Sequence, residues 1–166
     1  MWLTEGGGGS YIGLLFLLEN NNRMDVDLVN KVIRDFGNEW EKFSQDELST
    51  QELKGLFDNY FSLFPWGLLP QNAQGFDLGC GTGRWAKFVA PRVGVLHCVD
   101  PSVKALAVAK KTLGQLTNCE FHNWRVDQLP FPDGSMDFAY SLGVLHHIPN
   151  TQSAIDFCVQ KLKRGA

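Results

Sequence analysis

One short segment with three glycines at alternate positions constrains this chain most. An apolar entry that contains Asp77 leads into Gly79, Gly81 and Gly83, and the helix-like segment Trp85–Val89 follows. Glycines this close together let the backbone leave a strand by a sharp turn, with bare N–H groups facing a ligand. A carboxylate just before that turn would repel a pyrophosphate but attract an ammonium group or a hydroxyl. The segment therefore predicts a strand–turn–helix site for a ligand with a cationic end.

The spacing of the glycines also bears on a competing class of ligand. A dinucleotide-binding loop follows the pattern Gly-x-Gly-x-x-Gly, so its third glycine, counted from Gly79 and Gly81, would fall at position 84. Arg84 stands there instead. An NAD-dependent oxidoreductase is therefore a less favoured alternative, and a tight turn without any ligand is the other one.

From Gln74 onward, short apolar runs alternate with amphipathic segments. Strands that alternate with helices imply parallel βαβ units, so the sequence predicts an α/β fold. The expected strands are Phe76–Leu78, Val93–Val99, Glu120–Val126 and Met136–Leu142, and the expected helices are Arg84–Ala90, Ser102–Leu113 (with Ser102 as N-cap) and Thr151–Lys163.

The residues ahead of this region follow a different pattern. Gly6–Ser10 is typical of a flexible linker, and the apolar run Tyr11–Leu18 is a plausible strand, too short to span a membrane. No basic segment precedes it, which argues against a signal peptide. Asp25 or Asp27 is placed to cap a helix that includes Trp40, for which ordinary packing is favoured over a position above a ligand cleft.

A second N-terminal helix is better defined. Ser49–Glu52 is a capping-box sequence, apolar residues follow at helical spacing up to Phe64, and Pro65 ends the run. Its aromatic side chains are expected to pack in the core. The alternative is that some of them cover a substrate site as a lid.

The glycine segment resembles motif I of the class I S-adenosylmethionine-dependent methyltransferases of the type 11 domain, which reads as an acid, any residue and Gly-x-Gly-x-Gly. Three further matches lie downstream, so the resemblance covers Asn72–Ala166. It implies a Rossmann-like three-layer sandwich with a mainly parallel sheet and N-terminal helices. Residues 1–71 would form the linker, strand and helical extension, and residues 72–166 an incomplete S-adenosylmethionine-binding core.

The resemblance also makes the C-terminal strands a point of interest. The chain supplies about four of the strands usual in this family, so the rest are expected to be missing. The fourth strand would then lie at an open sheet edge, which invites pairing with a second copy or a partner chain. A less favoured expectation is that Tyr11–Leu18 fills one missing position.

The family pattern implies a set of cofactor-binding residues. The glycine loop would hold the methionine part, and Asp77 would engage its ammonium group directly or through water. Asp100 follows the loop by about 20 residues, where two carboxylate oxygens suit ribose hydroxyls; a capping or turn aspartate is the alternative. Asp127 would accept from the adenine amine unless it is a solvated loop acid. The full set is Asp77, Gly79, Cys80, Gly81, Thr82, Gly83, Asp100, Pro101, Ser102, Asp127, Gln128, Ser141 and Leu142.

No catalytic residue is firmly indicated. His146 and His147 are weak candidates for a general base, because histidine titrates near neutral pH, but a packing or cofactor-lining role is favoured. Two adjacent histidines are poor evidence for a metal site, and no metal is expected. Asp137, at the start of the expected fourth strand, is interpreted as structural.

Composition narrows the setting. The formal net charge of −3 and the lack of a strong basic cluster argue weakly against a nucleic-acid partner. The four cysteines form no CxxC pair, so neither a zinc knuckle nor a redox motif is expected, and a cytoplasmic protein fits best. The densest basic group, formed by Lys161, Lys163 and Arg164, is expected in the last turn of a helix.

Together these features predict methyl transfer from S-adenosylmethionine to an unidentified, small-molecule acceptor. The sequence lacks the Asn-Pro-Pro-Tyr or Asp-Pro-Pro-Tyr mark of many amino-group methylators of nucleic acid and glutamine. The main alternative is an inactive or partner-dependent cofactor-binding fragment, and the oxidoreductase is the remaining one.

Overall fold

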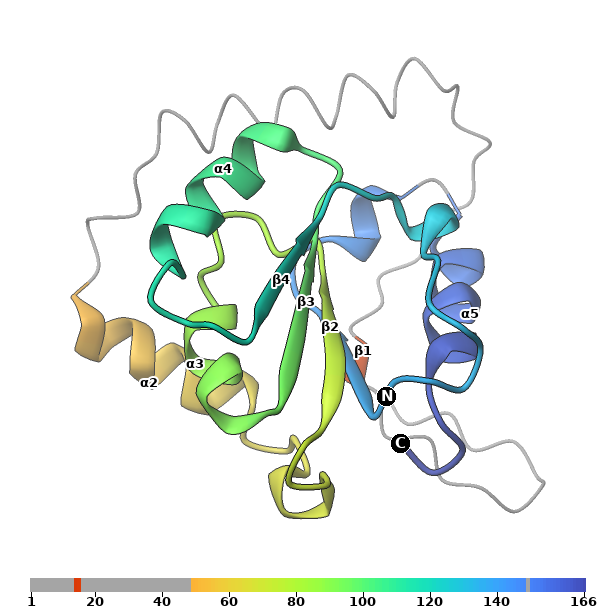
Figure 1. The fold of residues 1–166 in the computed structure, drawn as a ribbon, viewed down its shortest axis with the longest axis horizontal. Coiled ribbons are helices and arrows are strands. Elements are labelled where there is room, and N and C mark those ends of the chain that lie inside the picture. Colours follow the sequence, from red (N-terminus) through yellow and green to blue (C-terminus); the bar gives the residue numbers. More distant parts are fainter. Residues whose placement is uncertain (1–13, 16–48, 149) are drawn as a thin grey trace.

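The computed structural model describes residues 14–15, 49–148 and 150–166. This part of the chain is built on a parallel sheet with the strand order β1-β5-β2-β3-β4 (Figure 1). The predicted α/β fold with a parallel sheet is confirmed. The strands are β1 (Leu14–Leu15), β2 (Gln74–Leu78), β3 (Val95–Val99), β4 (Cys119–His122) and β5 (Phe138–Ser141).

Each of the three longer helices begins after a polar side chain that accepts a hydrogen bond from the first turn. Such a cap satisfies one of the backbone N–H groups that a helix start leaves without a partner. The predicted capping box is confirmed, because Ser49 and Glu52 exchange hydrogen bonds. The helices and their caps are α2 (Thr50–Tyr60, Ser49), α4 (Val103–Thr112, Ser102) and α5 (Thr151–Lys161, Asn150).

Several shorter helical segments complete the connections between strands. The expected helix Arg84–Ala90 is shortened to a single turn, which runs on as a 3-10 turn that contains Pro91. The segments are α3 (Ala86–Val89) and the 3-10 turns η1 (Trp66–Leu68), η2 (Ala90–Arg92), η3 (Val126–Gln128) and η4 (Leu145–His147).

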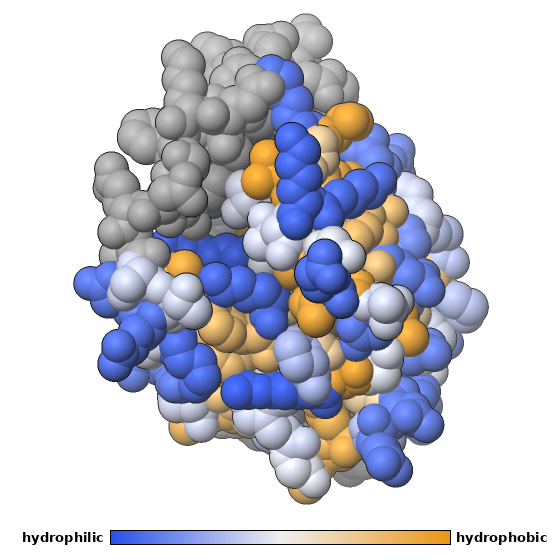
Figure 2. All heavy atoms as spheres, turned by 60° about the vertical axis from the view of Figure 1, so that its left-hand side comes forward, coloured by the Kyte–Doolittle hydropathy of each residue, from blue (hydrophilic) through white to orange (hydrophobic). Residues whose placement is uncertain are grey.

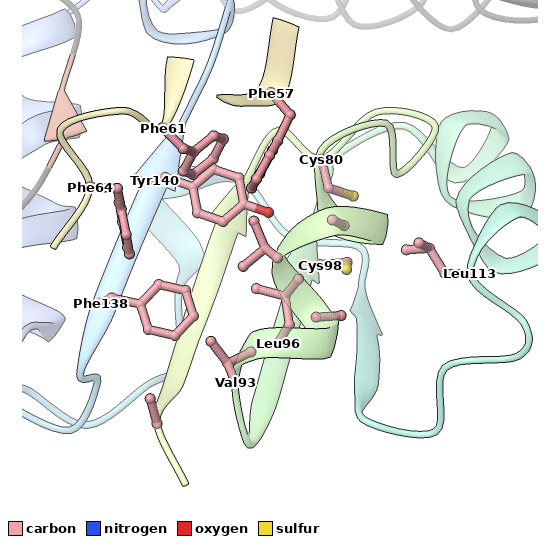
Figure 3. Packing of buried hydrophobic residues seen from close by; sticks show 14 of the residues in the cluster. Phe57, Phe61, Phe64, Cys80, Val93, Leu96, Cys98, Leu113, Phe138 and Tyr140 are labelled. Atoms are coloured by element: carbon pink, nitrogen blue, oxygen red, sulfur yellow. The ribbon is translucent and has the colours of Figure 1, made fainter. Parts of the chain in front are cut away.

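The helices cover both faces of the sheet, and each face has its own buried cluster (Figure 1). Residues of α2, α3 and α4 pack on one face, and residues of α5 pack on the other. Figure 3 shows Phe61 and Phe64 beside Tyr140 and Phe138 of β5, and the Phe61 and Tyr140 ring centroids lie 5.2 Å apart. The helix α2 ends at Tyr60, short of the expected Phe64, but the prediction that its aromatic run packs in the core is confirmed for Phe57, Phe61 and Phe64.

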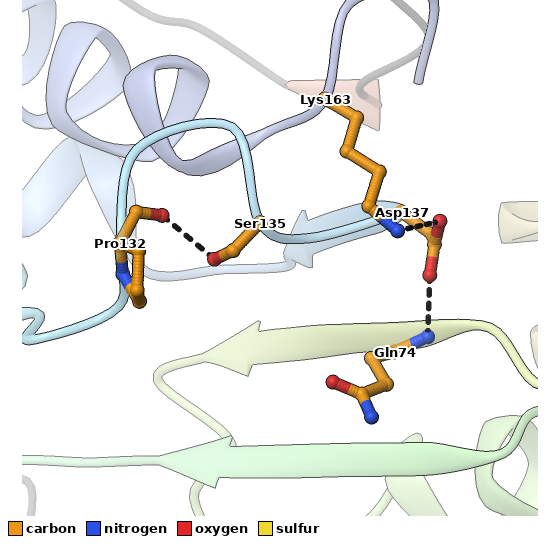
Figure 4. A network of polar contacts seen from close by, with 5 residues as sticks. All are labelled: Gln74, Pro132, Ser135, Asp137 and Lys163. Atoms are coloured by element: carbon orange, nitrogen blue, oxygen red, sulfur yellow. Dashed lines mark hydrogen bonds and ion pairs between the residues drawn. The ribbon is translucent and has the colours of Figure 1, made fainter.

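Asp137 fastens the amino-terminal edge of the sheet. Its Oδ2 accepts from the backbone N–H of Gln74 at 2.8 Å, and its Oδ1 lies 2.7 Å from Nζ of Lys163 (Figure 4). Because these bonds join β2, β5 and the segment after α5, the structural role predicted for Asp137 is confirmed. The predicted helical position of Lys163 and Arg164 is wrong, since α5 ends at Lys161 and Lys163 turns back to the sheet.

The expected strand Glu120–Val126 is also longer than the one observed. β4 ends at His122, because the side-chain amide of Asn123 donates to the carbonyl oxygen of Asp100 at 3.0 Å and draws the chain out of the ladder. Met136, predicted to start the fourth strand, makes only an isolated bridge to Leu162.

The edge beside β5 is not open in the described structure. β1 pairs with it in parallel, with Leu14 opposite Tyr140 and Leu15 opposite Ser141. The expectation of an open edge at the fourth strand is therefore wrong, and the less favoured alternative, a strand from the N-terminal segment at this position, is what the structure contains. The remainder of Tyr11–Leu18, the glycine linker and the helix with Trp40 lie outside the described residues.

Figure 2 shows the left-hand side of Figure 1 turned forward. Hydrophilic residues cover much of this face, and hydrophobic residues emerge between them. Leu63, Leu68 and Val103 are among the exposed hydrophobic side chains. Within residues 49–148 and 150–166, every helix is too short or too polar to cross a bilayer.

Candidate functional site

A cleft of about 640 Å³ opens at the carboxyl ends of β2 and β5. These two strands are neighbours in the sheet, but β3 follows β2 on the other side, so the strand order reverses between them. Open α/β sheets bind ligands at such a reversal. The cleft is lined by Tyr60, Gly79, Cys80, Gly81, Thr82, Arg84, Trp85, Ser141, Leu142, Gly143, Val144, Leu145 and His146.

The glycine loop forms one wall of this cleft. Gly79, Gly81 and Gly83 have φ angles of 74°, 54° and 80°, a left-handed region that other residues rarely adopt. A Cβ at position 79 would lie 2.4 Å from Cγ2 of Val144, on the opposite wall. Glycine is therefore required at position 79 both by the backbone and by the narrow space.

The expectation that the loop presents bare N–H groups to a ligand is wrong for four of its residues. The N–H groups of Gly79 and Cys80 both donate to the carbonyl oxygen of Val99, at 2.7 and 3.0 Å. That of Gly81 donates to Asp100, and that of Gly83 donates to the carbonyl oxygen of Cys80. The loop therefore offers a ligand close approach to its backbone rather than a row of free donors.

Asp77 lies near the carboxyl end of β2, two residues before Gly79, with only 2% of its surface exposed. Within the described residues, Oδ2 of Asp77 and the hydroxyl of Tyr140, its neighbour across the β2–β5 pair, each lack a hydrogen bond of good geometry, although the hydroxyl is close enough to favour the ionised carboxyl group. Burial raises the pKa of Asp77 to about 8; the Tyr140 hydroxyl opposes this shift, and the Asp100 carboxylate adds to it. A cation placed near this carboxyl group would favour its ionised form.

Asp100 is held against the glycine loop, as its position after the second strand of the core predicts. Its Oδ2 accepts from the N–H of Gly81 at 2.9 Å, and its Oδ1 accepts from the N–H of Ser102 at 2.8 Å. Burial raises its pKa, and these two backbone N–H groups oppose the shift. Asp100 therefore makes the turn contacts of the alternative interpretation, and each oxygen keeps a second lone pair for a ligand.

Other predicted cofactor residues stand apart from the cleft. Gly83, Pro101 and Ser102 are not among its lining residues. Asp127 and Gln128 are exposed in η3, where Oδ1 of Asp127 lies 3.1 Å from Nε of Arg125. The structure thus brings the glycine loop and the β5 segment together, but it does not bring η3 to the same cavity.

The segment after β5 forms the opposite wall. The hydroxyl of Ser141 donates to the carbonyl oxygen of Leu78 at 2.9 Å, which ties the carboxyl ends of β5 and β2. His146 lines the cleft and His147 does not, although their ring centroids are 3.8 Å apart. Burial and the neighbouring His146 lower the pKa of His147.

Tyr60, Arg84, Trp85 and Val144 line the cleft but are absent from the residues predicted to bind a ligand. The Tyr60 and Trp85 rings meet edge to face at 5.3 Å, and the guanidinium of Arg84 lies 5.0 Å from the Trp85 ring centroid. The position of Arg84 and Trp85 directly after the glycine loop was the available signal. Tyr60 lies in the helix whose aromatic residues are predicted to pack in the core. A lid over a substrate site is the alternative given for them, and Tyr60 fits that alternative.

Comparison with known proteins gives a consistent result. The profile of a family described as "Methyltransferase domain" matches residues 76–166, more than half of the chain. The chain is 33% identical over 92 residues to phosphoethanolamine N-methyltransferase 2 of Caenorhabditis elegans, which covers 54% of this chain and 21% of that protein. It is 31% identical over 96 residues to the tRNA (carboxymethyluridine(34)-5-O)-methyltransferase of Schizosaccharomyces pombe. That match covers 58% of this chain and 38% of the yeast protein.

A solved structure agrees at the level of the fold. Phosphoethanolamine N-methyltransferase 1 of Haemonchus contortus, in complex with phosphoethanolamine and S-adenosylhomocysteine, is similar with a TM-score of 0.65 and 16% identity. The match covers 85% of this chain and 31% of that one, so the chain spans less than two fifths of the length of these relatives. By its profile match, its fold and its glycine loop, the chain belongs to the methyltransferase domain family, whose cofactor is S-adenosylmethionine.

Proposed function

We propose that this chain binds S-adenosylmethionine in the cleft between β2 and β5 and transfers the methyl group to a small-molecule acceptor. The observation that carries the proposal is the position of the cleft. It lies at the reversal of strand order, and the left-handed glycine loop forms one of its walls. That position is where open α/β sheets bind their ligands.

Asp77 supports a ligand with a cationic end. A buried carboxyl group without a partner is costly to ionise, and an ammonium group nearby reverses that balance. Asp77 does not itself line the cleft, whereas Gly79 does. We therefore place the ammonium group of the cofactor beside Gly79, with its contact to Asp77 made through a water molecule.

Asp100 and η3 are the proposed supports of the nucleoside part. The backbone bond from Gly81 to Asp100 joins the wall of the cleft to the acid proposed for the ribose, so both would be positioned as one unit. Asp127 would exchange its contact with Arg125 for the adenine amine. An exposed ion pair is worth only about 0–1 kcal/mol, so this exchange costs little.

The chain's contribution to the reaction is positioning. When bound, the cofactor supplies an electrophilic methyl carbon, and displacement at that carbon requires the acceptor to approach in line. Holding two reactants in such a geometry can contribute about 7–11 kcal/mol. The bond from Ser141 to Leu78 and the Tyr60–Trp85 pair fix the walls between which the acceptor would lie. His146, which lines the cleft, would take a proton from an acceptor that must lose one.

The acceptor is proposed to be small. A cleft of about 640 Å³ is in the range of small-molecule sites, and the acidic net charge gives a polynucleotide no electrostatic footprint. One relative is named for a tRNA and another for phosphoethanolamine, so both classes belong in the test.

Methyl transfer from labelled S-adenosylmethionine tests the proposal. The full chain is incubated with phosphorylated amino alcohols, quinols and total tRNA, and the label is followed into each fraction. Label in a small-molecule fraction is expected. Label in tRNA alone would contradict the acceptor class. Binding of S-adenosylhomocysteine with no transfer would favour a cofactor-binding fragment, and thermal stabilisation by NAD alone would favour the oxidoreductase.

A further inference from the structure

Two histidines and a glutamate meet on the sheet away from the proposed cofactor cleft. His97 lies on β3, and Glu120 and His122 lie on β4. His97 and Glu120 are paired across the two strands, and Glu120 and His122 are two residues apart, so all three share one face of the sheet. None of the three lines the cleft between β2 and β5.

The ligand atoms of these side chains converge on one point. Nδ1 of His97 lies 3.0 Å from Nε2 of His122 and 3.2 Å from Oε2 of Glu120, and the latter two atoms are 3.7 Å apart. A tetrahedral Zn²⁺ ion with bonds of about 2.0–2.2 Å keeps its ligand atoms roughly 3.3–3.6 Å apart. The observed separations bracket that range, so one ion can meet all three atoms after small side-chain adjustments.

The surroundings also suit a borderline-soft divalent cation. The side chains of His97 and His122 are only 12% and 19% exposed, whereas that of Glu120 is 57% exposed. The His122 ring stacks on Trp124 with centroids 4.1 Å apart, and the His97 ring lies 4.8 Å from that of Phe131. The imidazoles are thus held in place by aromatic packing on rigid strands, and the glutamate side is open to solvent.

We propose that His97, Glu120 and His122 form a binding site for Zn²⁺ or a similar divalent transition-metal ion, with a water molecule in the open fourth position. Two imidazoles and one carboxylate make a ligand set typical of zinc. The proposal is independent of the methyltransferase function.

The site is linked to the segment that holds Asp100. The backbone N–H of Asp100 donates to the carbonyl oxygen of His122 at 3.1 Å, and the next residue, Asn123, donates to the carbonyl oxygen of Asp100. A bound ion would therefore fix the end of β4 beside this aspartate. Without an ion, the same atoms form a hydrogen-bonded histidine pair with Glu120 as acceptor, which is the competing account.

Zinc binding to chelator-treated, reduced protein distinguishes the two accounts. Isothermal titration with Zn²⁺ is carried out on the wild type, Glu120→Gln and His122→Gln. The matched control is the double variant His146→Gln/His147→Gln, because the whole chain has four histidines and these are the other two. Glu120 is exposed, so its variant is expected to fold, and thermal unfolding in chelator checks each sample.

We expect one Zn²⁺ per wild-type chain and a rise in the midpoint of thermal unfolding. Loss of a metal ligand should weaken binding by more than about 10–100-fold, the loss that follows removal of a group that only orients a ligand, while the control keeps its affinity. If Glu120→Gln and His122→Gln bound Zn²⁺ as tightly as the wild type, the proposal would be overturned. Absence of Zn²⁺ binding by folded wild-type protein would overturn it as well. With Co²⁺ as a spectroscopic probe, a thiolate charge-transfer band would overturn it too, because it would place the ion on cysteines.

Discussion

Asp77 and Asp137 are two aspartates at opposite edges of the same pair of strands. Asp137 lies at the amino-terminal edge of β2 and β5, and each of its oxygens has a partner, the Gln74 N–H or the Lys163 ammonium group. Asp77 lies near the carboxyl edge, and its Oδ2 has no partner in the described structure. The carboxylate of Asp137 is fully hydrogen-bonded, whereas the carboxyl group of Asp77 has a buried oxygen without a hydrogen bond.

The carboxyl edge of the sheet therefore carries the cost of a buried polar group without a hydrogen bond, and the amino edge does not. Buried polar groups are normally hydrogen-bonded, and an exception calls for an explanation such as a ligand. Asp77 lies in β2 two residues before Gly79, at the end of the sheet where the cleft opens. We therefore expect substitution of Asp77 to change both ligand binding and the pH dependence of stability, and substitution of Asp137 to change stability without changing ligand binding.

The largest expected effect is that of Asp77→Asn on the pH dependence of stability. Because its pKa is about 8 in the folded chain and 3.8 in the reference state, Asp77 contributes stability that is full below about pH 4 and is lost as pH rises to about 8. Asparagine lacks this slope. Urea unfolding measures the free energy of unfolding of both proteins at pH 5 and pH 8. The value for the variant minus that for the wild type should be larger at pH 8 by a few kcal/mol, on the order expected for such a pKa shift. Parallel pH profiles would show that Asp77 is not the source.

Gly79→Ala tests whether ligand binding depends on the close approach of the two walls of the cleft at this position. Gly143 provides a matched control, since it also lines the cleft and has a φ angle of 75°, but a Cβ there would meet no atom of the described residues within 4 Å. Both alanines carry the left-handed backbone cost of about 1–2 kcal/mol. Only Gly79→Ala should also lose S-adenosylhomocysteine affinity, by more than about tenfold or 1.4 kcal/mol. Equal losses in calorimetry would remove the steric argument.

Asp100→Ala should weaken cofactor binding by roughly 1–3 kcal/mol, because it removes the proposed ribose acceptor and leaves the Gly81 N–H without its partner. Calorimetry with S-adenosylhomocysteine measures this loss. Unchanged affinity in a folded variant would take Asp100 out of the site and leave it as the turn aspartate of the alternative.

At the other edge, Asp137→Ala should lower the free energy of unfolding by about 1–3 kcal/mol, because it removes the charged acceptor of the Gln74 N–H. Lys163 is half-exposed, so its ion pair adds little. Denaturant unfolding provides the measurement. If cofactor affinity in the folded variant fell instead, the division between the two edges would be wrong.

The smallest effect is expected for His147→Ala. This side chain does not line the cleft, so S-adenosylhomocysteine affinity should stay within about 0.5 kcal/mol of the wild type. A large loss would place His147, rather than His146, at the ligand.

Local sequence signals predicted much of this architecture. The capping box at Ser49, the cap at Ser102 and the structural role of Asp137 all follow from short-range patterns and occur as predicted. The proximity of Asp100 to the glycine loop follows from the βαβ unit, because the carboxyl ends of neighbouring parallel strands meet at one edge.

Long-range pairing explains what the sequence did not predict. The Gly79 and Cys80 N–H groups are taken by Val99 on the neighbouring strand, which no local pattern reveals. The pairing of β1 with β5 joins residues more than 120 positions apart. His97 and Glu120 become neighbours only through the β3–β4 register, so the histidine–glutamate cluster was invisible as a motif.

Proton release on cofactor binding shows whether Asp77 faces a cationic ligand. Calorimetric titration with S-adenosylhomocysteine at pH 7, in two buffers of different ionisation enthalpy, counts the protons exchanged. If an ammonium group bound near Asp77 lowers the pKa of its carboxyl group, the wild type should release close to one proton and Asp77→Asn none, with weaker binding in the variant. Equal affinity and no difference in proton release between the two proteins would contradict the account.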